Sequence, residues 1–288
     1  MCNEFSKLSN NIIFLFPKSS PLSQDDFKSI ESFLNENIHF KIKTIFSIDF
    51  MFIKNLNLKV WFYLKSMTFK FFLIIFLIKN RNEQIYIRER RSLKLILFFK
   101  MLGILKNKIF FEAHEYKFKN KRLLKFCNKL IVINQQLKNI YSEIYNNSIL
   151  VSHDAVSKNE LTKYNFKSNL NNHPIILYTG SFYSWKGVDL IISAATKLSD
   201  FNFVLIGGDQ DNLKRLNKIV LKNNLKNVEL LPKVNRNHLY KYIVNSDILL
   251  LPNLDVQINN WTSPLKLFEY MASKRLIIAS NLPSLMEI

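Results

Sequence analysis

The feature that most constrains this chain is a repeated alternation of short apolar runs with longer segments whose apolar residues recur at helical spacing. That alternation predicts parallel sheets covered by helices, because parallel strands are apolar on both faces and are joined by crossover helices. In the first half, strands are predicted at 11–16, 41–48, 84–87, 108–111 and 129–133, with helices near 24–35, 58–78, 92–103 and 135–145. In the second half, strands are predicted at 175–178, 203–206, 228–231 and 248–251, with helices at 188–198, 211–222 and 237–244. The predicted fold class is α/β, with two doubly wound, Rossmann-like domains.

A polar segment separates the two predicted domains. Residues 157–173 are rich in Asn and Lys and have no clear hydrophobic period, so we place the linker there. The predicted domains are residues 1–165 and 166–288. Two doubly wound domains that face each other leave a cleft at the carboxyl ends of their strands, where open α/β sheets bind ligands.

Composition narrows the class of protein. Hydrophobic residues make up 48% of the 288 residues, which excludes a disordered chain. The two cysteines, Cys2 and Cys127, stand in no metal or redox spacing, so no disulfide framework or thiolate zinc site is expected. No secretory signal is predicted, because the apolar run at 12–16 is too short. We therefore expect a cytoplasmic protein.

The most hydrophobic stretch is residues 60–78. Lys65 and Lys70 interrupt it, and its uninterrupted part, residues 71–78, is far short of the roughly 20 residues that span a bilayer. A transmembrane helix is therefore not predicted. A buried helix is the preferred interpretation, and a helix lying on a membrane surface is the alternative.

The formal net charge of +19 is concentrated in the first half of the chain. Residues 1–165 hold 27 basic and 13 acidic residues, whereas residues 166–288 hold 14 and 9. Lys, Asn, Ile and Phe are over-used together, so AT-rich codon usage explains part of the basicity. The remaining excess suits an anionic membrane surface at least as well as a nucleic acid, and a nucleic-acid partner is not favoured.

One candidate site is the loop after the predicted strand at 175–178. The sequence runs from Tyr178 through Gly180 to Lys186 and Gly187, where a helix begins. A glycine lets the backbone approach a ligand, a helix start offers unpaired amides, and a lysine adds a cation. These features suit a diphosphate, although a structural turn has the same pattern more often.

A second candidate site is the run from Ser263 to Ala272. Ser263 and Pro264 are predicted to cap and start a helix whose first amides would bind an anion. Lys266 in the first turn opposes the helix dipole, which makes sense when an anionic ligand is bound nearby. Glu269 is suited to accepting hydrogen bonds from ligand hydroxyls, or is a solvated helical glutamate.

A third candidate follows the predicted strand at 108–111, where Glu112, His114 and Glu115 crowd together. Active sites of α/β proteins form where strands end, so His114 is a candidate substrate contact, acid or base. A lone histidine is more often structural.

Taken in order, these segments resemble the retaining glycosyltransferases of family 4, which have the GT-B fold. The order is Glu112-x-His114, Gly180 with Lys186-Gly187, Gly207-Gly208, and the run from Ser263 to Ala272. The resemblance extends from about residue 84 to residue 288. Its most specific part is residues 263–284, which are similar to a run in capsule and surface-polysaccharide transferases.

The resemblance implies a metal-independent transferase with no cofactor. It would move a sugar, with retention, from a nucleotide-diphosphate sugar bound by residues 166–288 to a glycan or lipid-linked acceptor on the side of residues 1–165. It implies a role in surface polysaccharide synthesis, in the cytoplasm or peripherally on the inner membrane face.

The resemblance also implies roles for single residues. Lys186 would neutralise the donor diphosphate, Glu269 would hold the ribose hydroxyls, and His114 would lie beside the donor sugar. The donor would further contact Gly180, Ser181, the loop from Leu231 to Val234, Ser263, and the backbone at Pro264, Leu265 and Lys266.

Three departures from the family pattern keep an alternative open. Ser181 stands where the family has a phosphate-binding arginine, and Trp261 stands where it has a glutamate. The family continues beyond the position of residue 288, so we expect the second domain to be incomplete. The alternative is a catalytically degenerate basic protein on the same fold that binds polyanions or a membrane surface.

Overall fold

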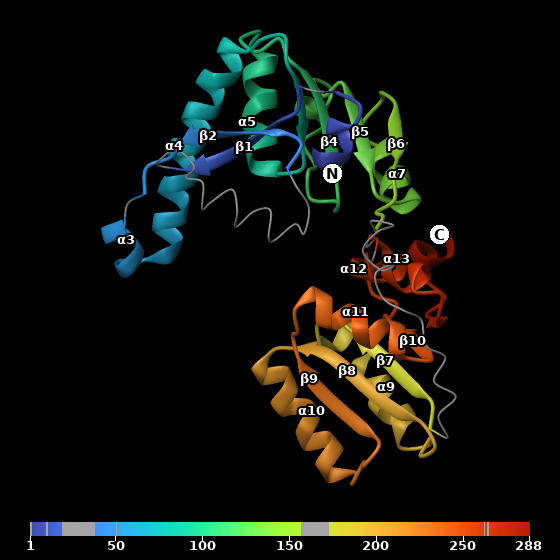
Figure 1. Cartoon of the computed structure of the whole chain (residues 1–288). Helices are drawn as coiled ribbons and strands as arrows, with labels where there is room; N and C mark the ends of the chain where they lie inside the picture. The colour runs from blue at the N-terminus through green and yellow to red at the C-terminus, as the bar shows by residue number, and fades with distance from the viewer. Residues whose placement is uncertain are drawn as a thin grey trace. The chain divides into compact units, whose positions relative to one another are not determined.

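The computed structural model describes residues 2–9, 11–18, 38–49, 51–156, 173–261, 263 and 265–288. Its strands form three parallel sheets, ordered β1-β2, β3-β4-β5-β6 and β11-β10-β7-β8-β9 (Figure 1). The predicted α/β class with parallel sheets is therefore confirmed. The predicted helix at 24–35 and the linker residues 157–172 lie outside the described residues, and the domain border at 165/166 stays a prediction.

The first part of the chain carries two of the sheets. Its elements are α1 (Cys2–Ser6), β1 (Ile13–Lys18), β2 (Lys41–Phe46), α3 (Met51–Leu56), α4 (Leu58–Lys79), β3 (Gln84–Ile87), α5 (Arg90–Met101), β4 (Lys108–Ala113), α6 (Lys121–Leu124), β5 (Lys129–Val132), α7 (Gln135–Ser142) and β6 (Ile149–Val151). The short elements α1, α3, α6 and β6 were not predicted, because runs of three to six residues leave too little periodicity to recognise.

The second part of the chain forms the five-stranded sheet, which is doubly wound. Its elements are β7 (Ile175–Thr179), η1 (Ser184–Lys186), α9 (Val188–Ala195), β8 (Asn202–Gly208), α10 (Gln210–Lys222), β9 (Val228–Pro232), α11 (Arg236–Asn245), β10 (Ile248–Leu251), α12 (Gln257–Asn260), α13 (Leu265–Ala272), β11 (Leu276–Ala279) and α14 (Pro283–Met286). One core cluster joins the sheet to α9 and α10, and a second joins it to α11, α13 and α14. Helices therefore cover its two faces, as the alternation predicts.

Contacts divide the chain into two compact units. Unit 1 comprises residues 1–111 and 122–128, and unit 2 comprises residues 112–121 and 129–288. Each unit is described by itself below.

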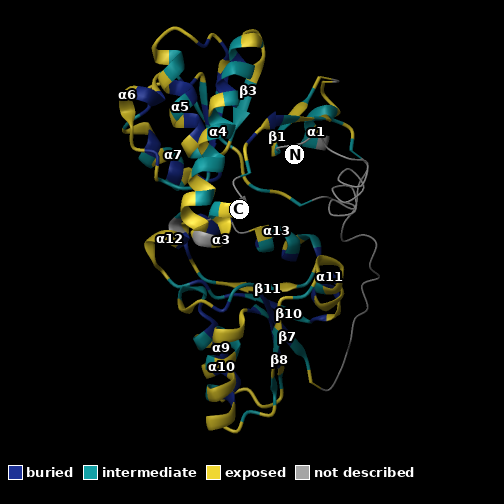
Figure 2. Ribbon diagram, turned by 90° about the vertical axis from the view of Figure 1, so that its left-hand side faces the viewer, coloured by how far each residue is buried: buried dark blue, intermediate teal, exposed yellow. Residues whose placement is uncertain are grey.

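The long helix α4 of unit 1 differs from its preferred interpretation as a buried helix. Asn57 caps it by accepting hydrogen bonds from the backbone amides of Lys59 and Val60, and only Leu73, Ile74 and Leu77 are buried. The interpretation holds for the C-terminal half alone. The N-terminal half carries exposed apolar side chains, and Figure 2 colours the residues of this helix by their burial. By length and composition, α4 is also apolar enough to cross a membrane.

Candidate functional site

Gly180 directly follows strand β7, the central strand of the five-stranded sheet. Its φ of +134° is one that side-chain-bearing residues rarely adopt, and an added Cβ would lie 2.3 Å from Nζ of Lys266. The backbone conformation favours glycine here, and the absence of a side chain leaves room for the lysine beside the backbone. The loop and the helix predicted separately from sequence therefore meet at this point.

Lys266 points its ammonium group inward from the first turn of α13. Nζ donates a hydrogen bond to the carbonyl oxygen of Thr179 at 2.5 Å and lies 4.5 Å from the ring centroid of Tyr178. Burial and, to a smaller extent, the positive charge of Lys186 lower the pKa of Lys266 to about 7, and Glu269 opposes the shift. The ammonium is thus held in a place that favours an anion beside it.

Tyrosines fix the strand end to which Lys266 binds. The hydroxyl of the buried Tyr270 lies 3.0 Å from the amide nitrogen of Thr179 and 2.9 Å from its Oγ1. The hydroxyl of Tyr178 donates to the carbonyl oxygen of Ser181 at 2.8 Å. Burial raises the pKa of Tyr270 to about 12, so it stays neutral and serves as a hydrogen-bonding group. Ser181 contributes its backbone here, and no charge replaces the arginine of the family pattern.

Lys186 is positioned by a tightly packed turn. It ends η1, and the next residue, Gly187, has φ of +71° and no room for a Cβ, which would lie 1.8 Å from the carbonyl oxygen of Pro252. The carbonyl oxygen of Trp185 accepts hydrogen bonds from Leu254 N at 3.1 Å and from Nδ2 of Asn259 at 3.0 Å. Burial lowers the pKa of Lys186, so a second cation is held partly out of water.

Glu269 lies on α13, one turn after Lys266. Its Oε1 lies 3.5 Å from Nη2 of Arg236 and 3.4 Å from the hydroxyl of Tyr240, which donates to it. Sequence reasoning missed Arg236. The available signal was its position at the start of the helix that follows β9, where a side chain reaches the carboxyl edge of the sheet.

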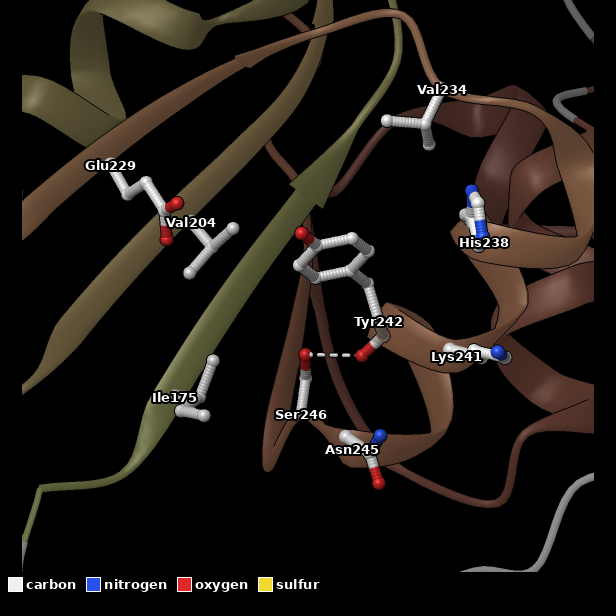
Figure 3. A pocket seen from close by; sticks show the side chains of 9 residues that line it. All are labelled: Ile175, Val204, Glu229, Val234, His238, Lys241, Tyr242, Asn245 and Ser246. Atoms are coloured by element: carbon white, nitrogen blue, oxygen red, sulfur yellow. Dashed lines mark hydrogen bonds between the residues drawn. The ribbon is translucent and has the colours of Figure 1, made fainter.

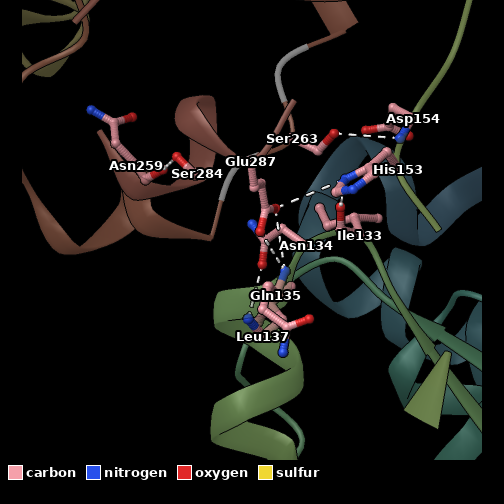
Figure 4. A network of polar contacts seen from close by, with 10 residues as sticks. All are labelled: Ile133, Asn134, Gln135, Leu137, His153, Asp154, Asn259, Ser263, Ser284 and Glu287. Carbon is pink, nitrogen blue, oxygen red and sulfur yellow. Dashed lines mark hydrogen bonds and ion pairs between the residues drawn. The ribbon is translucent and has the colours of Figure 1, made fainter. Parts of the chain in front are cut away.

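The start of α13 is described in part. Pro264 lies outside the described residues, and the helix begins at Leu265, whose side chain is exposed. Ser263 is buried, and its Oγ accepts a hydrogen bond from Asp154 N at 3.4 Å (Figure 4). The serine thus binds backbone of unit 2 through its side chain.

A neighbouring polar network in unit 2 centres on Glu287. Its carboxylate accepts a hydrogen bond from Gln135 N, at 2.9 Å to Oε2, and lies 3.8 Å from Nδ1 of His153 (Figure 4). Asn134 caps the same helix, α7, by accepting from Leu137 N at 2.8 Å. A carboxylate at a helix start stabilises the positive end of its dipole.

His114 follows β4 of the four-stranded sheet. Its Nε2 lies 2.5 Å from Oε1 of Glu112, a side chain that is itself buried. The carboxylate orients the imidazole ring and fixes which nitrogen carries the proton. Glu112 is therefore the second functional candidate at this position.

The predicted nucleobase loop is shorter than expected. Strand β9 continues to Pro232, so Leu231 is a strand residue packed on the core rather than a loop residue. The pairing of β9 with β8 extends the strand. Val234 does lie in the following loop, where it lines a 590 Å³ cavity between the sheet and α11 (Figure 3). Glu229, His238, Lys241 and Tyr242 also line this cavity.

Four predicted site residues thus come together in unit 2: Gly180, Lys186, Lys266 and Glu269. The arrangement offers two partly buried ammonium groups, a backbone without a side chain at the strand end, and one carboxylate. It is suited to binding a polyanion with hydroxyl groups next to it. Among the residues that the structure describes, no three His, Cys, Asp or Glu side chains are grouped to hold a metal ion.

The comparisons with known proteins bear on this same part of the chain. Residues 161–288 match the profile of the family described as glycosyl transferases group 1. A segment of 126 residues is 31% identical to an uncharacterized glycosyltransferase of Methanocaldococcus jannaschii, covering 44% of this chain and 34% of that protein. The chain therefore matches about a third of the length of this curated relative.

Two solved structures are similar over nearly the whole chain. A trehalose-6-phosphate protein from E. coli, bound with UDP-2-fluoro glucose, superposes with a TM-score of 0.61 at 11% identity, covering 96% of this chain and 86% of that one. The lipopolysaccharide outer core galactosyltransferase WaaB superposes with a TM-score of 0.60 at 14% identity, covering 94% and 81%. At such identities the likeness shows the fold alone, and it confirms the predicted GT-B class of α/β fold.

Proposed function

We propose that this protein is a glycosyltransferase that moves a sugar from a nucleotide-diphosphate sugar to a glycan or lipid-linked acceptor. The observation that carries the proposal is the position of Lys266. Its ammonium group is held at the end of β7, beside Gly180 and within the field of Lys186. Both lysines have a pKa lowered by burial, and Lys186 lowers that of Lys266 further, so the pair gains most from a ligand with two negative charges, such as a diphosphate.

In the proposed mechanism, these residues stabilise the departing nucleotide diphosphate. Negative charge grows on the leaving phosphate oxygen as the bond to the sugar breaks, and Lys186 and Lys266 are positioned to neutralise it. Gly180 lets the backbone approach the phosphates. Retention at the anomeric carbon is part of the proposal and is supported by the sequence resemblance to family 4. Independence from metal ions is supported by the same resemblance and by these two lysines.

Glu269 and His114 have proposed roles beside the diphosphate. Glu269 would accept hydrogen bonds from the ribose hydroxyls, and its contact with Arg236 orients the carboxylate. His114, oriented by Glu112, would contact the donor sugar. Glu112 is a positioning residue in this scheme, because it acts through the imidazole.

A role in surface polysaccharide synthesis in the cytoplasm is the finer part of the proposal. It is supported by the similarity of residues 263–284 to capsule and surface-polysaccharide transferases, and by the fold shared with a lipopolysaccharide galactosyltransferase. The structural neighbour that binds UDP-2-fluoro glucose makes UDP-sugars the first donors to test.

The test is ligand-dependent thermal stabilisation of the purified chain by UDP-, GDP-, ADP- and CMP-sugars and the free nucleotides. A selective shift is expected, worth about 2.7 kcal/mol when the ligand is present at 100 times its Kd. Lys186→Met and Lys266→Met should abolish the shift. Lys218→Met, at an exposed position of α10, is the matched control and should keep it.

Turnover completes the test. The sugar nucleotide that gives the shift is supplied with acceptor extracts, with and without a chelator, and the product's anomeric configuration is determined by NMR. Absence of a shift with every nucleotide, in a chain shown to be folded, would overturn the proposed function. Chelator-sensitive turnover or an inverted product would overturn the corresponding part alone.

A further inference from the structure

Helix α4 is mostly apolar, with four lysines distributed along it, yet the folded unit covers little of it. A helix of this kind belongs in a protein core or in lipid. Only Leu73, Ile74 and Leu77 are buried, all in its C-terminal half. The N-terminal half therefore exposes an apolar surface that water disfavours.

Four exposed apolar side chains lie on one face of α4, three in its N-terminal half and the fourth just beyond the middle. Val60, Tyr63, Met67 and Phe71 are 46%, 63%, 50% and 63% exposed. Their spacing of three, four and four residues places them in a single row along the helix. We call this row the apolar stripe. Phe52 of the preceding helix α3, 68% exposed, adds to the apolar surface at the same end of α4.

The charges near the apolar stripe are mostly positive, although the carboxylate of Glu89, which caps α5, lies within the field of Lys70. Residues 38–82 contain seven lysines and one arginine but a single acidic residue, Asp49. Asp49 is already engaged, because Lys65 Nζ and Trp61 Nε1 each donate to its carboxylate at 2.7 Å. Helices α3 and α4 themselves contain no acidic residue. The helical angles of Lys59 and Lys70 put them along one edge of the stripe.

We propose that the apolar stripe, with the lysines beside it, is a docking surface for the anionic headgroup region of a membrane. Apolar side chains enter the boundary between headgroups and acyl chains, and lysines extend their ammonium groups to lipid phosphates. Trp61 and Tyr63 are of the type enriched at that depth. A second copy of this chain fits less well, because a face that pairs with itself would bring like charges together.

This proposal stands on unit 1 alone and does not depend on the proposed function. A membrane contact would place the protein where a lipid-linked acceptor is found. The proposal concerns surface attachment, in agreement with the sequence prediction that α4 does not cross the membrane.

The experiment is flotation of the full chain with vesicles of phosphatidylcholine, with and without phosphatidylglycerol. Binding to the anionic vesicles is expected, with weaker binding to neutral ones and weaker binding at high salt. The double variant Tyr63→Glu with Phe71→Glu should lower the partition coefficient at least about 100-fold, because two apolar anchors are lost and two charges repel the lipid. Leu190→Glu with Leu221→Glu is the matched control, since it adds the same two charges at positions of α9 and α10 that are 56% and 78% exposed, and it should bind normally.

A second variant tests the charges without touching the apolar stripe. Lys59→Gln with Lys70→Gln should weaken binding to anionic vesicles about 30-fold and leave binding to neutral vesicles unchanged.

Equal binding of wild type to neutral and anionic vesicles would overturn the proposal, and so would wild-type binding by the Glu variant. Resistance to extraction by alkaline carbonate would replace surface docking by a spanning helix. A dimer that the Glu variant dissociates, with no flotation of wild type, would assign the face to a second copy. Donor-induced thermal stabilisation is measured on the same samples. A failure of membrane binding can then be distinguished from a failure of the proposed transferase function.

Discussion

The buried ammonium of Lys266 makes the stability of the fold depend on pH, and replacing it by methionine should remove that dependence. The pKa of Lys266 is about 7 in the folded protein, against an ordinary value of 10.5. Between these values the unfolded chain holds a proton that the folded chain has released. The unfolding free energy therefore rises as pH rises from 7 toward 10.5, whereas below pH 7 the full cost of burying the charge is present.

The magnitude follows from the size of this shift. For a fully buried group, the contribution gained between pH 6 and pH 9 is about 2.7 kcal/mol. Lys266 is partly exposed as a residue, so solvent screening reduces this to about 1–2 kcal/mol. Lys266→Met lacks this contribution. Its unfolding free energy should therefore rise less than that of wild type between pH 6 and pH 9, by about 1–2 kcal/mol.

The assay is chemical denaturation of wild type, Lys266→Met and Lys218→Met at pH 6, 7, 8 and 9. A Trp61→Phe background removes the tryptophan of unit 1, so that fluorescence reports on Trp185 and Trp261 of unit 2. Lys218→Met should follow wild type. Parallel pH curves for wild type and Lys266→Met would show that the ammonium is not held out of water, and would refute the reasoning. Lys266→Met should also lose donor-induced stabilisation. The substitution would thus abolish donor binding while it removes the free-energy cost of burying the ammonium group.

Three further substitutions test how the site is built. Gly187→Ala should cost at least about 2 kcal/mol in thermal or chemical unfolding, because its Cβ would overlap the carbonyl oxygen of Pro252; a stability within 0.5 kcal/mol of wild type would contradict the turn geometry. Tyr270→Phe should cost about 1–3 kcal/mol, because it leaves the amide and hydroxyl of Thr179 without their buried partner; unchanged unfolding would contradict this. Gly180→Ala should displace the Lys266 ammonium and weaken donor-induced stabilisation, and a normal Kd by calorimetry would exclude the predicted contact.

The fold was predictable wherever apolar periodicity lasts long enough to be recognised. Strands β3 and β10 begin and end where the sequence predicts, and α4 differs by one residue at its end. Strand β6 has three residues and was missed, because its only support is the pairing with β5 in register. Strand β9 runs one residue further than predicted, because its pairing with β8 continues beyond Leu231.

The site was predictable by residue type and less so by contact. Gly180 and Lys266 were each expected near a phosphate, but their close approach depends on α13 packing beside β7, which no local pattern encodes. Arg236 and Glu269 lie on different helices and are 33 positions apart in the sequence, so no local spacing pattern predicts their pairing. The exposure of α4 was likewise hidden, because an apolar pattern without a polar face gives the same signal for core, interface and membrane.

The two notable surfaces of this protein have opposite relations to water. At the end of β7, charged groups are partly withdrawn from water, which lowers the pKa of Lys186 and Lys266 and costs folding free energy. On α4, apolar groups are left in water, which also costs free energy. A chain optimised for folding stability alone would avoid each cost, with a neutral side chain at position 266 and polar side chains along the apolar stripe. An anion bound beside Lys186 and Lys266 would offset the first cost, and a membrane surface with apolar and anionic groups would offset the second. Ligand binding therefore explains both the buried lysines of unit 2 and the exposed apolar residues of unit 1.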